Sequence, residues 1–390
     1  MNRRRLRKIA EKKKAMSPQK KHEKAPKVLI AAGNGHITEV EMIKGLRRCG
    51  IDAQAVFAST STHLQALIDA GVPTRTLDLK NNADFLNILK LRRWIKRERF
   101  DIVHGLANRQ VANLISASYG LQNVMVAYRG AVGHVSRWDP GCYLKWLNPR
   151  IDRIICVSEA VKEDLAKNGV NPKKLSTIYK GHDLKWYADL DRATARRAVD
   201  TEFGIPSNAV LIGMAANLRP VKGADLLIKA LQSLPNDVHA LIIGEIRDNN
   251  LRDLIDRSNI KNRIHYTGYR KDAPSLIGAL DINCAPSRGR EGLTKTVIEG
   301  LAQGVPTIVS TAGGLPEMVD HGETGYIFTV NDVSELIQCL ENLIRSTQLR
   351  NTMGERGKSL MQNRFNVRTT INLTAKLYRR LTQESTSPNV

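Results

Sequence analysis

Short strand-like runs alternate with stretches of helical apolar spacing along most of this chain of 390 residues. Each run has the length of a buried strand and ends in glycine or a polar turn. Such alternation is typical of β-α-β units, in which crossover helices join parallel strands. The runs lie at 28–32, 53–58, 101–104, 124–127, 154–157, 210–215, 239–243, 263–267, 282–285 and 307–310. The sequence therefore predicts an α/β protein with parallel sheets.

The alternation loosens once, around Tyr179 to Arg197, where the sequence turns polar and Arg-rich. Because the chain is too long for one typical core, we expect two doubly wound, Rossmann-like domains. They would face each other across a cleft at the carboxyl ends of their strands. The expected segments are a basic disordered leader (1–26), an N-terminal acceptor-binding domain (27–180), a linker (181–208), a C-terminal nucleotide-sugar-binding domain (209–364), a C-terminal helix (365–382) and a disordered tail (383–390).

The stretch 286–314 has the pattern loop, helix, strand, loop. Glu291 lies in a glycine-flanked turn before the helix, and Glu299 lies on the helix face opposite its apolar side. Free amides at 293–296 and the positive end of the helix dipole favour a phosphate there, which Gly292 lets approach the backbone. From spacing alone, a solvated amphipathic helix with ordinary surface charges is the alternative.

A second glycine turn follows the first strand of the second series, at 216–223, and places Lys222 beside another helix start. Together with Arg290-Glu291-Gly292 to Glu299, Gly304-Val-Pro306 and Gly313-Gly-Leu-Pro-Glu317, this turn resembles the nucleotide-sugar half of the family 4 glycosyltransferases, which have the GT-B fold. The resemblance extends over the whole body of the chain, and the leader and tail fall outside it. It implies a retaining enzyme that uses neither a divalent ion nor another cofactor.

The resemblance also assigns roles by position. It makes Glu291 and Lys222 the catalytic pair, with Glu291 on the hydroxyls of the donor sugar and Lys222 on the diphosphate, and it puts Glu299 on the ribose. The departing nucleoside diphosphate gains negative charge, which a fixed lysine and aligned amides stabilise. The donor would be a UDP-, GDP- or other nucleotide-activated sugar. The cradle around its phosphates is completed at Gly292, Leu293, Thr294 and Lys295.

Three departures from the family pattern leave the donor's identity open. Asn217 stands where the family usually has Arg, so that Arg219 or Lys295 is left to supply the second phosphate cation. Leu293-Thr294 replaces Phe-Gly after the first Glu, and Lys180-Gly-His-Asp183 replaces Asn-Gly-x-Asp in the linker. None of these changes removes the two acids or the lysine.

The expected acceptor side of the cleft is formed by the first domain. His104 and Arg129 each end a predicted strand, and parallel strands end at the same sheet edge. His36 follows the tight turn between Gly33 and Gly35. We expect these five residues to line the cleft, and a purely structural role is the alternative for each histidine.

The formal net charge is +22, and residues 1–27 supply twelve Lys or Arg against two Glu. Such a charge suits a polyanion, either nucleic acid or an anionic bilayer. A basic helix over 85–99 and an aromatic and basic cluster at Trp138, Tyr143, Lys145 and Trp146 could both contact a membrane surface, or could pack as ordinary structure. The sequence shows no signal peptide and no apolar run long enough for a membrane span.

Two patterns argue against metal chemistry and disulfides. Asp189-Leu-Asp191 has the D-x-D spacing of metal-dependent transferases but lies among helix-entry residues, so we expect no metal there. Five scattered cysteines contain no C-x-x-C pair, which favours a reducing cytosol.

The sequence thus predicts a cytoplasmic, hexosyltransferase-type enzyme, peripheral at the inner face of the membrane. It would transfer a sugar to a hydroxyl of a glycolipid or surface polysaccharide intermediate, as in lipopolysaccharide, capsule or exopolysaccharide synthesis. A basic nucleic-acid-binding α/β protein and a catalytically idle GT-B scaffold are the alternatives. No nucleic-acid partner is expected, because the chain shows no aromatic RNA-binding strand and no zinc-finger spacing.

Overall fold

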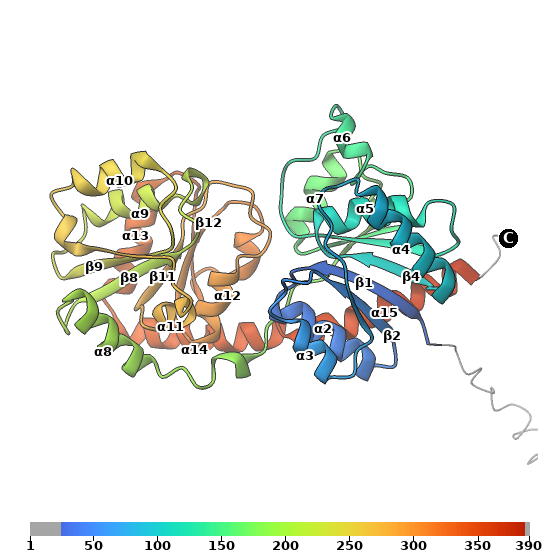
Figure 1. Ribbon diagram of the computed structural model, residues 1–390. Coiled ribbons are helices and arrows are strands. Elements are labelled where there is room, and N and C mark those ends of the chain that lie inside the picture. Colours follow the sequence, from blue (N-terminus) through green and yellow to red (C-terminus); the bar gives the residue numbers. More distant parts are fainter. Residues whose placement is uncertain (1–24, 387–390) are drawn as a thin grey trace, which may run out of the picture.

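The computed structural model describes residues 25–386 and shows two α/β halves side by side (Figure 1). The predicted leader, 1–26, lies outside the described residues except for its last two positions. Of the predicted tail, 383–390, residues 383–386 belong to the last helix, and 387–390 lie outside the described residues.

The first half is built on a parallel sheet of seven strands in the order β3-β2-β1-β4-β5-β6-β7. The five runs predicted here are all strands. The two edge strands, β3 and β7, escaped prediction because they have three residues each and are largely polar. The strands are β1 (Lys27–Gly33), β2 (Asp52–Phe57), β3 (Thr74–Thr76), β4 (Ile102–Gly105), β5 (Val124–Arg129), β6 (Arg153–Cys156) and β7 (Leu175–Thr177).

The second half has a parallel sheet of six strands in the order β10-β9-β8-β11-β12-β13. All five predicted runs are present, and only β13, an edge strand, was missed. The strands are β8 (Val210–Ala215), β9 (Val238–Ile243), β10 (Ile264–Gly268), β11 (Ile282–Ala285), β12 (Thr307–Ser310) and β13 (Gly325–Phe328). Two doubly wound parallel sheets therefore confirm the predicted fold class.

Helices cover both faces of each sheet, which explains why the central strands are apolar on both sides. In the first half they are α2 (Ile37–Arg48), α3 (Leu64–Asp69), α4 (Phe85–Glu98), α5 (Asn108–Ser118), α6 (Pro140–Tyr143) and α7 (Glu159–Lys167). In the second half they are α8 (Arg192–Phe203), α9 (Ala224–Leu231), α10 (Asn249–Asp256), α11 (Ala273–Gly278), α12 (Lys295–Ala302), α13 (Val333–Ile344) and α14 (Thr347–Arg364).

The last helix, α15 (Val367–Thr386), returns to the first half and runs beside α2 (Figure 1). Ile371 and the fully buried Tyr378 pack into the core there. A Cβ at Gly45 of α2 would overlap Ile371, so the two helices meet at a glycine.

Within residues 25–386 the chain passes between the halves twice, at neighbouring points. His182 donates its amide to the Phe365 carbonyl at 2.7 Å, and the Val367 amide donates to the His182 carbonyl at 3.0 Å. Helix α8 falls within the predicted linker, 181–208. It is anchored to the second half by Arg192, which donates to the carbonyls of Gly278, Leu280 and Gly304.

Candidate active site

The turn before α12 holds a buried carboxylate. Glu291 is 6% exposed, and its Oε1 lies 2.6 Å from Lys222 Nζ. Ser287 Oγ donates to the same oxygen at 2.6 Å, and Thr294 Oγ1 donates to Oε2 at 3.0 Å. Two hydroxyls and one ammonium therefore fix the orientation of this carboxylate.

Lys222 reaches Glu291 because two turns meet closely. It ends the 3-10 turn η3 (Pro220–Lys222), and Gly223 follows in the left-handed region with φ 70°. A Cβ at Gly223 would overlap the carbonyl oxygen of Pro286, at the start of the Glu291 turn. Only glycine suits both the backbone angle and this approach, which explains the Lys-Gly pair in the sequence.

The helix itself begins later than predicted. Thr294 is the N-cap, α12 starts at Lys295, and the Thr294 amide donates to Met318 Sδ at 3.3 Å. Leu293 packs against both neighbouring cores. Of the amides expected to be free at 293–296, that of Thr294 is therefore occupied, and the open end of the helix lies at Lys295 and Thr296.

Glu299 lies on the first turns of α12 and is 2% exposed. Lys295 Nζ, itself half exposed, lies 3.0 Å from its carboxylate. Burial raises the pKa of Glu299, while the lysine opposes this shift. Lys295 is therefore ion-paired with Glu299 in this structure. It would have to leave this pair to act as the expected phosphate cation.

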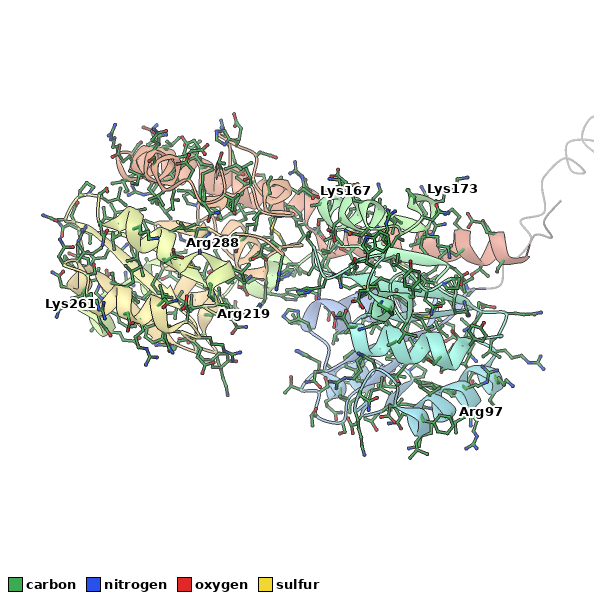
Figure 2. All side chains as sticks on the ribbon, turned by 90° about the horizontal axis from the view of Figure 1, so that it is seen from above. Arg97, Lys167, Lys173, Arg219, Lys261 and Arg288 are labelled. Atoms are coloured by element: carbon green, nitrogen blue, oxygen red, sulfur yellow. The ribbon has the colours of Figure 1, made fainter. Side chains whose placement is uncertain are left out.

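Asn217 and Arg219 lie on the exposed loop that precedes Lys222. Among the described residues, neither side chain has a hydrogen-bonding or ionic partner. Arg219 lies near the side of the second half that is turned toward the first (Figure 2). Arg288, nearby, is already held by Asp225 at 2.7 Å and by the Pro220 carbonyl at 2.8 Å. Arg219 is thus the available cation closest in sequence to Lys222.

The first half carries a cavity of about 890 Å³ at the carboxyl ends of its strands, as predicted for an α/β sheet. Gly33 lines it, with φ 63°, and a Cβ there would crowd Gln110. The polar side chains around it include Asn34, Thr60, Asp78, Asn108, Arg109 and His134.

His36 lies between the halves. It caps α2, follows Gly35, which has φ 64°, and lies 6.3 Å from the rings of both His63 and His182. Burial, followed by the charges of Lys180 and Lys295, lowers its pKa to about 4. His36 is therefore neutral near pH 7.

His104 does not face the cavity, contrary to our expectation. It is 1% exposed, and its Nδ1 is hydrogen-bonded to Tyr378 Oη of α15 at 2.6 Å. Side chains alternate along a strand, so His104 shares the face of Ile102, which α2 and α15 cover. Burial lowers its pKa to about 3. His104 is a core residue that secures α15.

Arg129 lines the cavity but is 6% exposed and already engaged. Its guanidinium lies 4.7 Å from the centroid of the Trp146 ring and donates to the Gly133 carbonyl. It therefore supports the cavity wall. Trp146 is buried beneath it, whereas Trp138 and Tyr143 of the same predicted cluster are exposed.

The two parts of the site meet at glycines. A Cβ at Gly292 would overlap the carbonyl oxygen of Gly130, which lines the cavity of the first half. The Glu291 turn therefore touches the rim of that cavity. Of the predicted residues, the structure gathers the acids, Lys222 and the glycine turns around this junction and leaves His104 outside it.

Sequence reasoning missed four residues here: His63, His182, Ser287 and Glu317. Ser287 and Glu317 lie inside motifs already noted, and His182 is hydrogen-bonded to Tyr187 Oη at 2.7 Å.

Of the predicted D-x-D pair, Asp191 caps α8 by accepting from the amides of Ala193 and Thr194, which confirms the expected helix entry.

Solved structures share this architecture. The glycosyltransferase from Rickettsia africae ESF-5 superposes with a TM-score of 0.78 and 21% identity, covering 92% of this chain and 98% of that one. Anabaena HepE in complex with UDP superposes with a TM-score of 0.74 and 20% identity, covering 90% and 99%. Two parallel sheets, the C-terminal helices and these neighbours establish the GT-B fold.

Two family models match successive parts of the chain. "Glycosyltransferase Family 4" covers residues 39–186 and "Glycosyl transferases group 1" covers residues 196–360. The chain belongs to the group 1/family 4 glycosyltransferases.

Curated relatives share about a quarter of their aligned residues with this chain. The UDP-Gal:alpha-D-GlcNAc-diphosphoundecaprenol alpha-1,3-galactosyltransferase of Escherichia coli is 25% identical over 79% of this chain and 82% of its own length. N-acetyl-alpha-D-glucosaminyl L-malate synthase of Bacillus anthracis is 26% identical, but the match spans only about half of each protein: 50% of this chain and 51% of the relative.

Proposed function

We propose that this glycosyltransferase transfers a sugar, with retention and without a divalent ion, from a nucleoside-diphosphate sugar to a hydroxyl acceptor. One observation carries the proposal. The buried carboxylate of Glu291 and the ammonium of Lys222 lie 2.6 Å apart beside the start of α12, with Glu299 on the same helix. Acids that accept sugar hydroxyls and a cation for a diphosphate are thereby gathered at one helix N-terminus.

The ion pair suggests how the donor is received. A bound diphosphate would draw Lys222 away from Glu291 and leave that carboxylate to accept hydroxyls of the donor sugar. Ser287 and Thr294 keep Glu291 in place during the exchange, since both donate to it independently of Lys222. As the sugar bond breaks, Lys222 and the open amides of α12 stabilise the charge that grows on the leaving diphosphate.

We propose a donor class from the names of similar proteins and an acceptor class from the polar groups of the cavity. The Escherichia coli relative is named for UDP-Gal and HepE was solved with UDP, so UDP-sugars are the first donors to test. The cavity of the first half offers amide, hydroxyl and guanidinium groups, which suit a saccharide. We propose a glycolipid or surface polysaccharide intermediate as acceptor, in line with the diphosphoundecaprenol named for that relative.

A lipid acceptor would bring the protein to the cytoplasmic face of a membrane. The α4 side of the first half carries a groove of about 340 Å³ with Arg75, Lys90, Arg93 and Arg97 among its lining residues. Arg97 lies on the outer side, away from the second half (Figure 2). Phe85 and Leu86 at the start of α4 are 69% and 70% exposed. Basic and apolar groups together favour an anionic lipid surface.

No helix among residues 25–386 is long and apolar enough to cross a membrane.

A donor panel tests this proposal. Because a ligand that binds the native state raises the melting temperature, UDP-, GDP- and ADP-sugars are compared by thermal shift, with hydrolysis of each donor measured alongside. We expect one base to be preferred, a smaller shift for Lys222→Ala, and unchanged hydrolysis after EDTA treatment. If no nucleotide sugar shifts the melting temperature or is hydrolysed, the proposal fails.

A further inference from the structure

Glu317 belongs to the second half, but the first half binds its carboxylate. It lies in the 3-10 turn η5 (Leu315–Met318). Its Oε2 accepts the Glu159 amide and its Oε1 accepts the Ala160 amide, both at 2.8 Å. The hydroxyl of Tyr179, also in the first half, donates to Oε2 at 3.0 Å. Three hydrogen bonds therefore join the halves through one side chain.

These bonds complete the N-terminus of α7. The hydroxyl of its N-cap, Ser158, accepts from the Val161 amide at 3.3 Å, and within residues 25–386 the amides of Glu159 and Ala160 find their partner in the carboxylate of Glu317. A carboxylate at this position satisfies both amides and faces the positive end of the helix dipole. Separating the halves would expose these amides to water, so the contact stabilises the arrangement in which α7 touches the Glu317 turn.

The turn that carries Glu317 also contacts the loop at 286–294, which contains Glu291 and is called the donor loop below. The Gly314 amide donates to the Glu291 carbonyl at 3.1 Å, and Met318 Sδ accepts the Thr294 amide at 3.3 Å. A Cβ at Gly313 would overlap the Glu291 carbonyl, and one at Gly314 would overlap the Gly292 carbonyl. Because the turn and the main chain at Glu291 are in direct contact, a shift of the turn relative to α7 would move the donor site as a unit away from the first half.

The turn is anchored from its far side as well. Arg364, the last residue of α14, donates to the Glu317 carbonyl at 3.1 Å and to Asp320 Oδ1 at 3.0 Å. The second crossing between the halves follows directly, where the His182 carbonyl accepts the Val367 amide. The turn is therefore in contact with α7, with the donor loop and with Arg364, which lies next to the second crossing between the halves.

We infer that Glu317 is a positioning residue, which latches the first half onto the donor loop and so sets the distance between the bound sugar and the acceptor cavity. This inference extends the proposed function to the residue that aligns its two substrates. Its structural part, the closure of α7 on the turn, can be measured without any substrate.

Hydrogen exchange on the full chain tests the structural part. In Glu317→Ala, exchange at the amides of Glu159 and Ala160 should rise by about tenfold or more, since each loses a hydrogen bond to a charged acceptor. Small-angle scattering should show a larger radius of gyration. Glu323→Ala is the matched control, because this carboxylate pairs with Arg356 inside the second half. Tyr179→Phe, which removes one of the three bonds, should give a smaller change.

Kinetics test the positioning part. Glu317→Ala should bind UDP as tightly as wild type, because the residue does not touch the proposed donor site, whereas kcat for transfer to an acceptor should fall by about tenfold or more. Glu317→Gln, which keeps one accepting oxygen, should recover part of the rate.

Each result decides a separate point. Unchanged exchange at Glu159 and Ala160 in Glu317→Ala overturns the latch. Faster exchange with unchanged scattering and unchanged kcat reduces Glu317 to a helix cap and overturns its positioning role. A wild-type protein that binds no nucleoside diphosphate contradicts the proposed function, while the exchange and scattering data still decide whether the latch exists.

Discussion

The two halves share one architecture but differ in how their polar groups are arranged. In the second half both acids of the site are buried and each is paired with a lysine, Glu291 with Lys222 and Glu299 with Lys295. In the first half a cavity of about 890 Å³ remains, and its one deeply buried cation, Arg129, is turned onto Trp146. If the proposed function is correct, the donor has to displace existing ion pairs in the second half, whereas the acceptor enters a cavity that is already open in the first half.

The largest expected effect concerns the ion-paired acids of the second half. Glu291→Ala should lower kcat for transfer by about a hundredfold or more, because this carboxylate orients the reacting sugar while Lys222 and α12 still hold the diphosphate. Steady-state kinetics with the preferred donor measure this, and Glu245→Ala, an exposed acid in the same half, is the control. A Glu291→Ala enzyme with wild-type kcat would remove the carboxylate from the reaction.

The contact of the first half with α15 should be sensitive to acid. The pKa of His104 is lowered to about 3, so between pH 6.5 and 3 the unfolded state binds a proton that the folded state does not. Stability is therefore lost as pH falls, by about 2 kcal/mol at pH 5 from this residue alone. Denaturant unfolding at pH 7 and pH 5 measures the loss. In His104→Gln the difference between the two pH values should shrink by that amount, and an unchanged difference would contradict the assignment.

A bulky residue at the cavity should separate acceptor use from donor use. Asn108 is exposed at the start of α5 and lines the cavity. Asn108→Trp should lower kcat/KM for the acceptor by about tenfold, since filling the cavity excludes part of the substrate, while donor hydrolysis stays at the wild-type rate. Equal loss of both activities would show that the cavity is not a separate acceptor site.

The smallest expected effect concerns membrane binding. Each Lys or Arg near an anionic leaflet contributes about 1 kcal/mol, so removal of residues 1–26 should reduce co-sedimentation with anionic vesicles severalfold, and added salt should weaken binding of the intact chain. Donor hydrolysis should not change. If the truncated protein sediments fully, the basic groove at α4 becomes the anchor to test with Arg93→Glu. If intact protein ignores vesicles and binds RNA with a steep salt dependence, the nucleic-acid alternative gains support.

The grouping of the acids in the second half could be predicted from the sequence, because they lie in one continuous stretch. Glu291, Thr294 and Glu299 are neighbours along the chain, and Lys222 is marked by the glycine that follows it. The first half was harder. His104 ends a strand as predicted, but the helix that buries it, α15, is 263 positions further on at its start, and no local pattern shows where that helix packs.

The same limit applies to contacts between the halves. Glu317 stood in a visible Gly-Gly-Leu-Pro-Glu motif, yet its partners, Glu159, Ala160 and Tyr179, belong to the other half. The edge strands β3, β7 and β13 were missed for a different reason. β3 and β7 have three largely polar residues each, and β13 is only half-buried at its two central positions, so none of them shows the continuously buried apolar run of the central strands.

The central claim is that Lys222, at the entrance of α12, binds the diphosphate of the donor. Calorimetric titration of UDP into the full-length protein tests it most directly, with Lys229→Ala as control, since Lys229 pairs with Asp225 on α9 in the same half. The account predicts that wild type and Lys229→Ala bind UDP alike and that Lys222→Ala binds it at least about tenfold more weakly, because a charge-assisted contact is lost. Equal affinity of Lys222→Ala and wild type for UDP would contradict it.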